Sequence, residues 1–290
     1  MLQRRLARSV LYLPGINQRA LDKLHGLDCD AAILDLEDAV SPLKKVEARA
    51  MVCEAARKGY GPRKEIAIRI NALDTMWGND DLTHVVDSGA HAIVVPKVDS
   101  AEALLEVAAK MDDLGAPKDM ALWAMIETPL GVLNVQSIAR SGHPRVACLV
   151  AGTSDLAKEL QCTVTPCRHA LVPSLAQIVL AARAYNLTCL DGVHLDLDNA
   201  ADFALQLKQG KEMGFHGKTL IHPKTIDATN AMFSPSSEEI EHAHAIIQAF
   251  DAAIAAGDGM AVYNGKLIES LHVELARATI AIAEQIQDRK

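Results

Sequence analysis

The sequence is poor in aromatic residues, in clustered basic residues and in paired cysteines, and each shortage excludes a class of protein. Phe, Trp and Tyr make up 3% of its 290 residues, and the formal net charge is −8 at pH 7. A surface that binds nucleic acid or an anionic membrane depends on clustered Lys and Arg, so we expect neither partner. The six cysteines form no CxxC pair, and we expect reduced thiols rather than disulfides or a zinc site.

Long apolar runs are also missing. Residues 10–13 follow two arginines, but this run stops at Pro14-Gly15 and is too short for a signal peptide or a membrane span. We therefore expect a cytoplasmic protein whose partners are small molecules or proteins. What the chain does have is 50% hydrophobic residues, enough to bury one large core.

Eight short apolar runs rich in β-branched residues recur along the chain, and segments with helical spacing separate them. The runs cover residues 9–15, 31–40, 65–72, 92–97, 121–128, 147–152, 188–193 and 218–223. Strands that alternate with helices pair in parallel, and eight such units have the size of a (β/α)8 TIM barrel. The sequence therefore predicts an α/β protein with a barrel over residues 1–230. Residues 231–290 are predicted to form a C-terminal helical extension that packs on the barrel or on a neighbouring subunit.

Two nucleotide-binding patterns are absent. The turn after the first run reads PGINQR and lacks the GxGxxG of a dinucleotide-binding sheet. The GKT at residues 217–219 suggests a P-loop, but Glu212 stands where that loop needs its first glycine. The absence of GxGxxG argues against a doubly wound dinucleotide-binding fold, and the missing glycine argues against a P-loop.

Charged residues stand where the predicted strands end, which is where a TIM barrel carries its active site. They are Asp35, Glu37, Asp38, Arg69, Lys97, Glu127, Asp155 and Asp191. Glu127 and Asp155 close successive units, so their carboxylates can converge as oxygen ligands for Mg2+. Alternatively, Asp155 caps the next helix, and Arg69 forms a structural ion pair with Asp35 or Glu37.

Eight segments in order carry a family resemblance: LYLPG, AAILDLEDAVSP, IRINALDTMWGNDDL, IVVPK, AMIETPLGV, AGTSDL, GKTLIHPKTI and YNGKLIES. They resemble the citrate lyase β-subunit-like (HpcH/HpaI aldolase/citrate lyase) family, which includes malyl-, citramalyl- and citryl-CoA lyases. The resemblance implies a TIM barrel, usually a homotrimer, that binds Mg2+, an acyl-CoA and a small keto or hydroxy acid. The implied reaction is cleavage of a 3-hydroxy-acyl-CoA to acetyl-CoA and a keto acid.

The resemblance also implies roles by position. It makes Glu127 and Asp155 the metal ligands and Arg69 the catalytic arginine that holds the substrate oxygens. The remaining roles are substrate binding by the backbone at Gly152, Thr153 and Ser154, and support of the water around the ion by Asp35, Glu37 and Asp38.

The chain departs from the family pattern at two places. Relatives carry a catalytic aspartate followed by a proline late in the chain, whereas this sequence has Glu269 and no proline. Glu269 could do the same acid-base work, or it could be an ordinary acid in the first turn of a helix. After the first strand, many relatives read PGxRPxxxxKA, whereas this sequence has Asn17 and Gln18 in place of the arginine and the proline. Arg19 and Lys23 remain as candidates for CoA phosphates, although an exposed helix face explains them equally well.

Three functions therefore stay open. The first is the Mg2+-dependent carbon-carbon lyase. The second is a metal-dependent aldolase or a thioesterase acting on a related acid. The third is a non-catalytic acyl-CoA-binding subunit that has lost turnover through the change at Glu269.

Overall fold

The computed structural model describes residues 5–257 and 260–289. The contacts divide the chain into two compact units, one that ends at Asn230 and one that begins at Ala231.

The first unit is a closed barrel of parallel strands, in the order β1 to β8, with β8 paired to β1. The strands are β1 (Ser9–Pro14), β2 (Ala31–Asp35), β3 (Glu65–Arg69), β4 (Ala92–Val95), β5 (Ala121–Ile126), β6 (Val146–Ala151), β7 (Thr188–Asp191) and β8 (Gly217–Leu220). Each of the eight apolar runs coincides with one of these strands, although β6 and β8 each begin one residue before their run. The predicted TIM barrel is confirmed.

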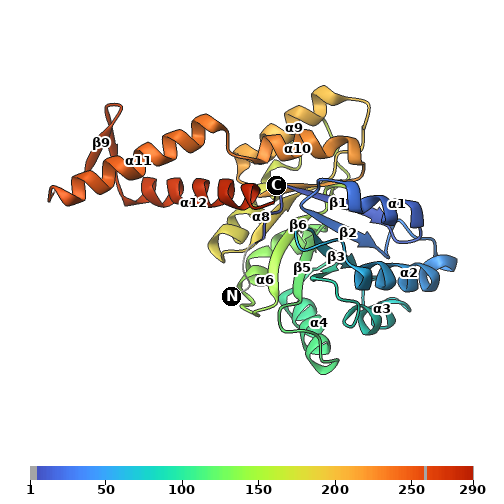
Figure 1. Ribbon diagram of the computed structural model, residues 1–290. Coiled ribbons are helices and arrows are strands. Elements are labelled where there is room, and N and C mark those ends of the chain that lie inside the picture. Colours follow the sequence, from blue (N-terminus) through green and yellow to red (C-terminus); the bar gives the residue numbers. More distant parts are fainter. Residues whose placement is uncertain (1–4, 258–259, 290) are drawn as a thin grey trace. The chain divides into compact units, whose positions relative to one another are not determined.

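Helices follow the strands and enclose them, as Figure 1 shows for α2, α3, α4 and α6. The helices are α1 (Gln18–Lys23), α2 (Lys45–Lys58), α3 (Gly78–Val85), α4 (Ala101–Asp113), α5 (Pro129–Leu133), α6 (Val135–Arg140), α7 (Thr153–Glu159), α8 (Val172–Ala184), α9 (Ala200–Met213) and α10 (Ile226–Phe233). Their ends follow from local sequence. Asn199 caps α9 by accepting a hydrogen bond from the Asp202 N–H, and Gly214 ends α9 in the left-handed conformation, with φ of 97°.

Alternation along the strands places the site. One hydrophobic cluster takes every second residue of the strands, among them Ile33, Ala67 and Met125, and so fills the barrel interior. Two residues further along β2 and β3 stand Asp35 and Arg69, and Glu127 directly follows β5. The same alternation therefore turns these three charged side chains into the mouth of the barrel.

The second predicted strand is shorter than its apolar run, residues 31–40. It ends at Asp35 because the carboxylate of Asp35 accepts hydrogen bonds from the N–H groups of Glu37 (2.9 Å) and Ala39 (3.0 Å). These bonds fold the chain into a turn, so Glu37 and Asp38 lie on a loop beside the mouth.

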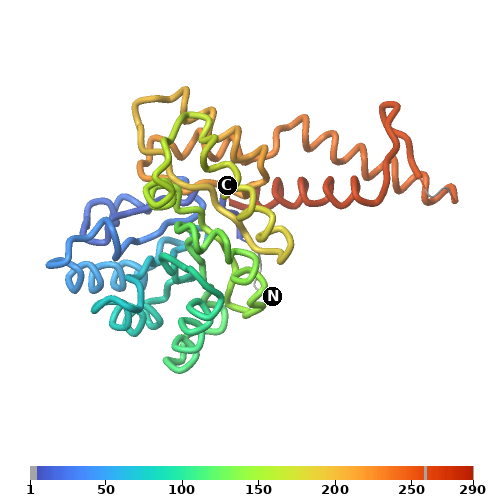
Figure 2. The backbone as a smooth tube through the Cα atoms, turned by 180° about the vertical axis from the view of Figure 1, so that it is seen from behind, coloured from blue at the N-terminus to red at the C-terminus, as the bar shows by residue number. Residues whose placement is uncertain are grey.

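The second unit is a helical hairpin with a small sheet. It contains α11 (Ser237–Ala255), β9 (Ala261–Tyr263), β10 (Lys266–Ile268) and α12 (Ser270–Gln287). Helices α11 and α12 lie side by side, as Figure 2 shows, over an apolar cluster that includes Ile246, Ile268 and Val273. Asn264 and Gly265 join β9 to β10 with φ of 49° and 72°, the backbone that a two-residue hairpin needs.

The structure also tests the predictions on disulfides and on membrane spans. All six cysteines lie in the described residues, and none of them forms a disulfide. In the described part of the chain, no helix combines the length and hydropathy of a membrane span.

Candidate active site at the carboxyl end of the barrel

An arginine clamp joins two neighbouring strands at the mouth. Arg69 at the end of β3 donates from Nε to Oδ1 and from Nη2 to Oδ2 of Asp35 at the end of β2, each at 2.6 Å. The guanidinium also lies over the ring of Tyr12, 5.2 Å from its centroid. Burial alone would lower the pKa of Arg69, but Asp35 outweighs it and the pKa is raised. The ion pair that the sequence left open therefore exists, and it fixes the guanidinium plane.

Glu37 lies against the other side of the same guanidinium. Its Oε2 is 2.7 Å from Nη1 of Arg69, yet this buried oxygen makes no well-aligned hydrogen bond. Burial, followed by the neighbouring carboxylates, raises the pKa of Glu37, although Arg69 acts against the shift. Asp38 is more exposed, and its Oδ2 lies 3.4 Å from Nη1 of Arg69. Oε2 of Glu37 is thus occupied by the ion pair with Arg69, while Oε1 lies 3.6 Å from Nζ of Lys97.

Glu127 is almost fully buried at the mouth, with 3% of its surface exposed. Burial raises its pKa to about 7, and the negative charges of Glu37 and Asp155 add to the effect. Its Oε1 accepts a hydrogen bond of 2.7 Å from the backbone N–H of Lys97. A side chain at Gly152 would overlap Glu127, so the glycine at the end of β6 makes room for this carboxylate.

The chain turns directly after Glu127 because Thr128 and Pro129 begin a helix. The Thr128 hydroxyl accepts a hydrogen bond of 2.9 Å from the Gly131 N–H, and Pro129 occupies the first turn of α5. A strong helix start thus terminates β5 and leaves the Glu127 carboxylate at the rim of the interior.

Asp155 lies in the first turn of α7 and does not cap it. Gly152 is the N-cap residue, so the interpretation of Asp155 as a capping residue is wrong. The Asp155 side chain is 28% exposed, and its Oδ2 is 3.9 Å from Nζ of Lys97. Thr153 is buried and Ser154 is exposed.

Lys97 follows β4 and contacts three acids. Its N–H binds Glu127, while its Nζ lies 3.6 Å from Oε1 of Glu37 and 3.9 Å from Asp155. Burial alone would lower the pKa of Lys97, but these carboxylates outweigh it and raise the pKa. From the sequence, Lys97 could be identified only as a residue at a strand end. Its hydrogen bond to Glu127 could not be predicted, because it depends on a left-handed backbone conformation of Lys97, with φ of 50°.

The mouth carries an excess of negative charge. Its carboxylates are Asp35, Glu37, Asp38, Glu127 and Asp155, and its cations are Lys45, Arg69 and Lys97. No group of three or more His, Cys, Asp or Glu side chains in the described residues forms a complete metal cage. Glu127 and Asp155 instead offer two hard oxygen donors, which fits Mg2+ because it retains water and substrate ligands.

Three predicted residues, Arg19, Lys23 and Glu269, are not among the charged groups of this cluster. Arg19 and Lys23 are exposed on α1. Glu269 belongs to the second unit, where it is the N-cap residue of α12 and its N–H donates to Nδ1 of His272 at 3.0 Å. The acid-base role of Glu269 stays a prediction.

A buried ion network at the end of β7 escaped the sequence analysis. Asp191 accepts hydrogen bonds from Nη1 of Arg168 (2.7 Å) and from Nζ of Lys218 (2.8 Å). Lys218 is the lysine of the GKT segment that resembles a P-loop. One signal could have indicated this pair. Strand β7 ends in an acid, Asp191, and the neighbouring strand β8 carries the lysine that pairs with it in register.

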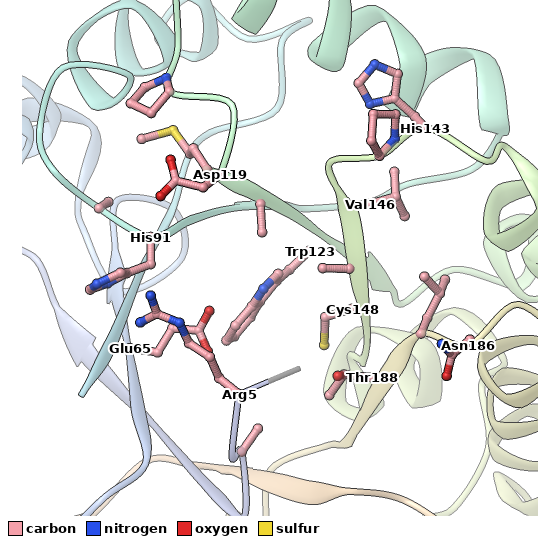
Figure 3. Close-up of a pocket in the computed structure, with 18 of the residues that line it drawn as sticks. Arg5, Glu65, His91, Asp119, Trp123, His143, Val146, Cys148, Asn186 and Thr188 are labelled. Carbon is pink, nitrogen blue, oxygen red and sulfur yellow. The ribbon is translucent and has the colours of Figure 1, made fainter. Parts of the chain in front are cut away.

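The pocket shown in Figure 3 lies at the other end of the barrel. Its volume is about 920 Å³, and its lining includes Glu65, Ala121, Val146 and Thr188, each at the start of a strand. Trp123 lies at its centre. Because all strands are parallel, this pocket opens on the face opposite the carboxylates and is not part of the candidate active site.

Comparisons with known proteins agree with this geometry. A sequence model of the HpcH/HpaI aldolase/citrate lyase family matches residues 8–223. A (3S)-malyl-CoA thioesterase of Cereibacter sphaeroides is 46% identical over 280 residues, which cover 96% of this chain and 95% of that one. Citrate lyase subunit beta of Escherichia coli is 32% identical, with coverage of 97% and 94%. The structure of protein CitE from Mycobacterium tuberculosis in complex with magnesium and acetoacetate is 25% identical, with a TM-score of 0.67 over 79% of this chain and 93% of that one.

Proposed function

Because the chain belongs to the HpcH/HpaI aldolase/citrate lyase family, we propose that it is a Mg2+-dependent enzyme that hydrolyses the thioester of a malyl-type 3-hydroxy-acyl-CoA. Water would add to the thioester carbonyl carbon, the carbon-sulfur bond would break, and the products would be free CoA and a hydroxy diacid. The observation that carries the proposal is the pair of acids, Glu127 and Asp155, joined through Lys97 at the mouth of the barrel.

The carboxylates of Glu127 and Asp155 would hold the ion, which would polarise a substrate oxygen as a Lewis acid. The solved relative with magnesium and acetoacetate supports this role, since acetoacetate is a small keto acid. Glu37, whose Oε1 has only a long contact of 3.6 Å with Nζ of Lys97, would accept a hydrogen bond from water beside the ion. Asp35 and Asp38 would act through Arg69, which they hold in place.

Arg69 and the start of α7 would bind the substrate. Asp35 prevents rotation of the guanidinium, so Arg69 offers a fixed positive charge to the hydroxyl or carboxylate oxygens of the substrate. The N–H of Gly152 already donates to the Ile126 carbonyl at 3.0 Å. The substrate carboxylate would therefore use the N–H groups of Thr153 and Ser154. We also propose that Arg19 and Lys23 bind the CoA phosphates from α1.

A carbon-carbon lyase is the second candidate. It is favoured by the 32% identity to citrate lyase subunit beta and by the same two carboxylates. Thioester hydrolysis ranks first for two reasons. The thioesterase is more similar, at 46% identity, and the aspartate that lyases of this family use on the acetyl carbon is Glu269 here, one methylene longer.

A product assay separates the two reactions. Purified protein is incubated with (3S)-malyl-CoA, citramalyl-CoA or citryl-CoA, with Mg2+ or with excess EDTA, and the CoA species are separated by chromatography. We expect free CoA and malate from malyl-CoA only when Mg2+ is present. Acetyl-CoA and a keto acid in place of free CoA would overturn hydrolysis in favour of the lyase. Substrate binding without any product would instead support the non-catalytic subunit.

We further propose that the protein is a homotrimer in which the second unit packs against the barrel or a neighbouring subunit. The support is an exposed apolar stripe on α12, formed by Leu271, Leu275 and Ile282. An apolar stripe of this kind is typical of a helix that packs on another protein surface.

A further inference from the structure

Lys97 places its ammonium among the acids to which the divalent ion is assigned. Its Nζ lies 3.6 Å from Glu37 and 3.9 Å from Asp155, and its own N–H binds Glu127. One residue therefore contacts both proposed ligands and the acid beside them. Two cations cannot share this space without strong repulsion.

The Nζ contacts are long and easily broken. Both exceed the 2.7–2.9 Å typical of a charge-assisted hydrogen bond, so they are electrostatic contacts rather than tight ion pairs. The Lys97 side chain is 46% exposed, which gives its ammonium a path to solvent. By contrast, Arg69 is held by two bonds of 2.6 Å and has no such freedom.

A hydrogen bond to Glu127 fixes the backbone of Lys97, whereas its side chain makes only long contacts. Its φ of 50° lies in the left-handed region, which is strained for a residue other than glycine. That conformation aims the N–H at Oε1 of Glu127. The backbone thus orients a proposed ligand whether or not the ammonium is present.

From these contacts we propose that the ammonium of Lys97 neutralises the mouth when no divalent ion is bound, and that it turns to solvent when the ion binds. The inference rests on the proposed function for the ion itself. Lys97 is in this sense a tethered competitor that lowers the affinity for Mg2+ and prevents the acids from repelling one another in its absence.

Calorimetric titration with Mn2+, and with Mg2+ where the heat allows, tests the competition. Lys97→Met keeps the backbone N–H and a similar length but removes the charge. We expect this variant to bind the ion about three- to tenfold more tightly than the unaltered protein. Lys97→Arg keeps a cation and should bind within about twofold of the unaltered protein. Lys58→Met, which removes an exposed lysine paired with Glu54, is the matched control and should change nothing.

The sign of the change separates competition from a merely structural role. A structural role for Lys97 predicts weaker binding in Lys97→Met, because a disturbed site binds an ion less well. Equal or weaker binding in this variant would overturn the inference while leaving the metal site intact. Failure of the unaltered protein to bind either ion would overturn the proposed metal site and this inference with it. As a second readout, the melting temperature in EDTA should fall in Lys97→Met and recover with Mg2+.

Discussion

At the scale of single residues, the site contrasts two ways of holding charge at the end of an apolar strand. The charge of Arg69 is neutralised by the two carboxylate oxygens of Asp35. Glu127, by contrast, accepts one hydrogen bond from a backbone N–H and lies near two further acids. The positions of both residues could be predicted, because side chains alternate between the two faces of a strand and the ends of the strands are visible in the sequence. Asp35 or Glu37 could also be named as a partner of Arg69, but the partner of Glu127 could not, because the conformation of Lys97 depends on contacts that no local pattern encodes.

The raised pKa of Glu127 makes the stability of the metal-free protein depend on pH. Its folded-state pKa of about 7 exceeds the ordinary 4.5, so the folded state holds this proton more strongly. The favourable contribution is complete below pH 4.5 and is lost as the pH rises to about 7. We expect Glu127→Gln, in EDTA at pH 8, to be more stable by about 2–3 kcal/mol, with little difference at pH 4.5.

Urea unfolding at the two pH values checks this expectation, with the exposed Glu159→Gln on α7 as the control. An equal change in the free energy of unfolding at both pH values would contradict it. With Mg2+ present, the same Glu127→Gln variant should lose turnover about a hundredfold or more, because it replaces a proposed carboxylate ligand of the ion by a neutral amide.

Gly152 is predicted to be irreplaceable at the site. The methyl group of Gly152→Ala would overlap the Glu127 side chain, so the carboxylate must move. We expect Mn2+ to bind about ten- to a hundredfold more weakly, as measured by calorimetry. Gly26→Ala is the matched control, because its methyl group would meet no atom within 4 Å. Unchanged affinity in Gly152→Ala would mean that Glu127 is not a ligand in this position.

At the scale of elements, β7 and β8 are joined by charge as well as by backbone hydrogen bonds. Asp191, Arg168 and Lys218 are each at most 2% exposed, and they come from β7, the segment before α8 and β8. The partners stand 23 and 27 residues from Asp191 in the sequence. Only closure of the barrel brings them together, which is why the GKT segment could be rejected as a P-loop without its true role being found.

Removing the acid should leave two buried cations without a counter-charge. We expect Asp191→Asn to destabilise the fold by about 3–5 kcal/mol in urea unfolding. Asp198→Asn, which removes an exposed acid paired with Lys224, should cost less than about 1 kcal/mol. Comparable losses in the two variants would show that the buried network contributes no more than a surface pair.

At the scale of the whole molecule, the sequence was sufficient for the barrel because eight apolar runs and their helices repeat one pattern. It was insufficient for the acid-base residue. Glu269 lies at the start of α12, where a helix cap and a catalytic acid look alike in sequence. The assembly could not be predicted for a similar reason, because an exposed apolar stripe does not identify the surface that covers it.

A trimer has a mass of about three times 31.2 kDa, which size-exclusion chromatography with light scattering can measure. We expect that mass for the unaltered protein and a smaller species for Leu275→Glu, because the charge enters the apolar stripe of α12. Leu114→Glu, at the end of α4, is the control. A monomer for the unaltered protein would contradict the proposed assembly.

The hairpin between β9 and β10 bears on the chemical lifetime of the chain. Asparagine is among the thermolabile residues, and Asn264 is exposed and followed by a glycine that offers little steric hindrance. Attack of the Gly265 amide nitrogen on the Asn264 side-chain carbonyl releases ammonia and forms a cyclic succinimide, which water then opens to aspartate or isoaspartate. Isoaspartate adds one backbone atom to the two-residue turn that joins the paired strands β9 and β10. Ageing of stored protein should therefore begin in this turn, far along the sequence from the acids of the barrel.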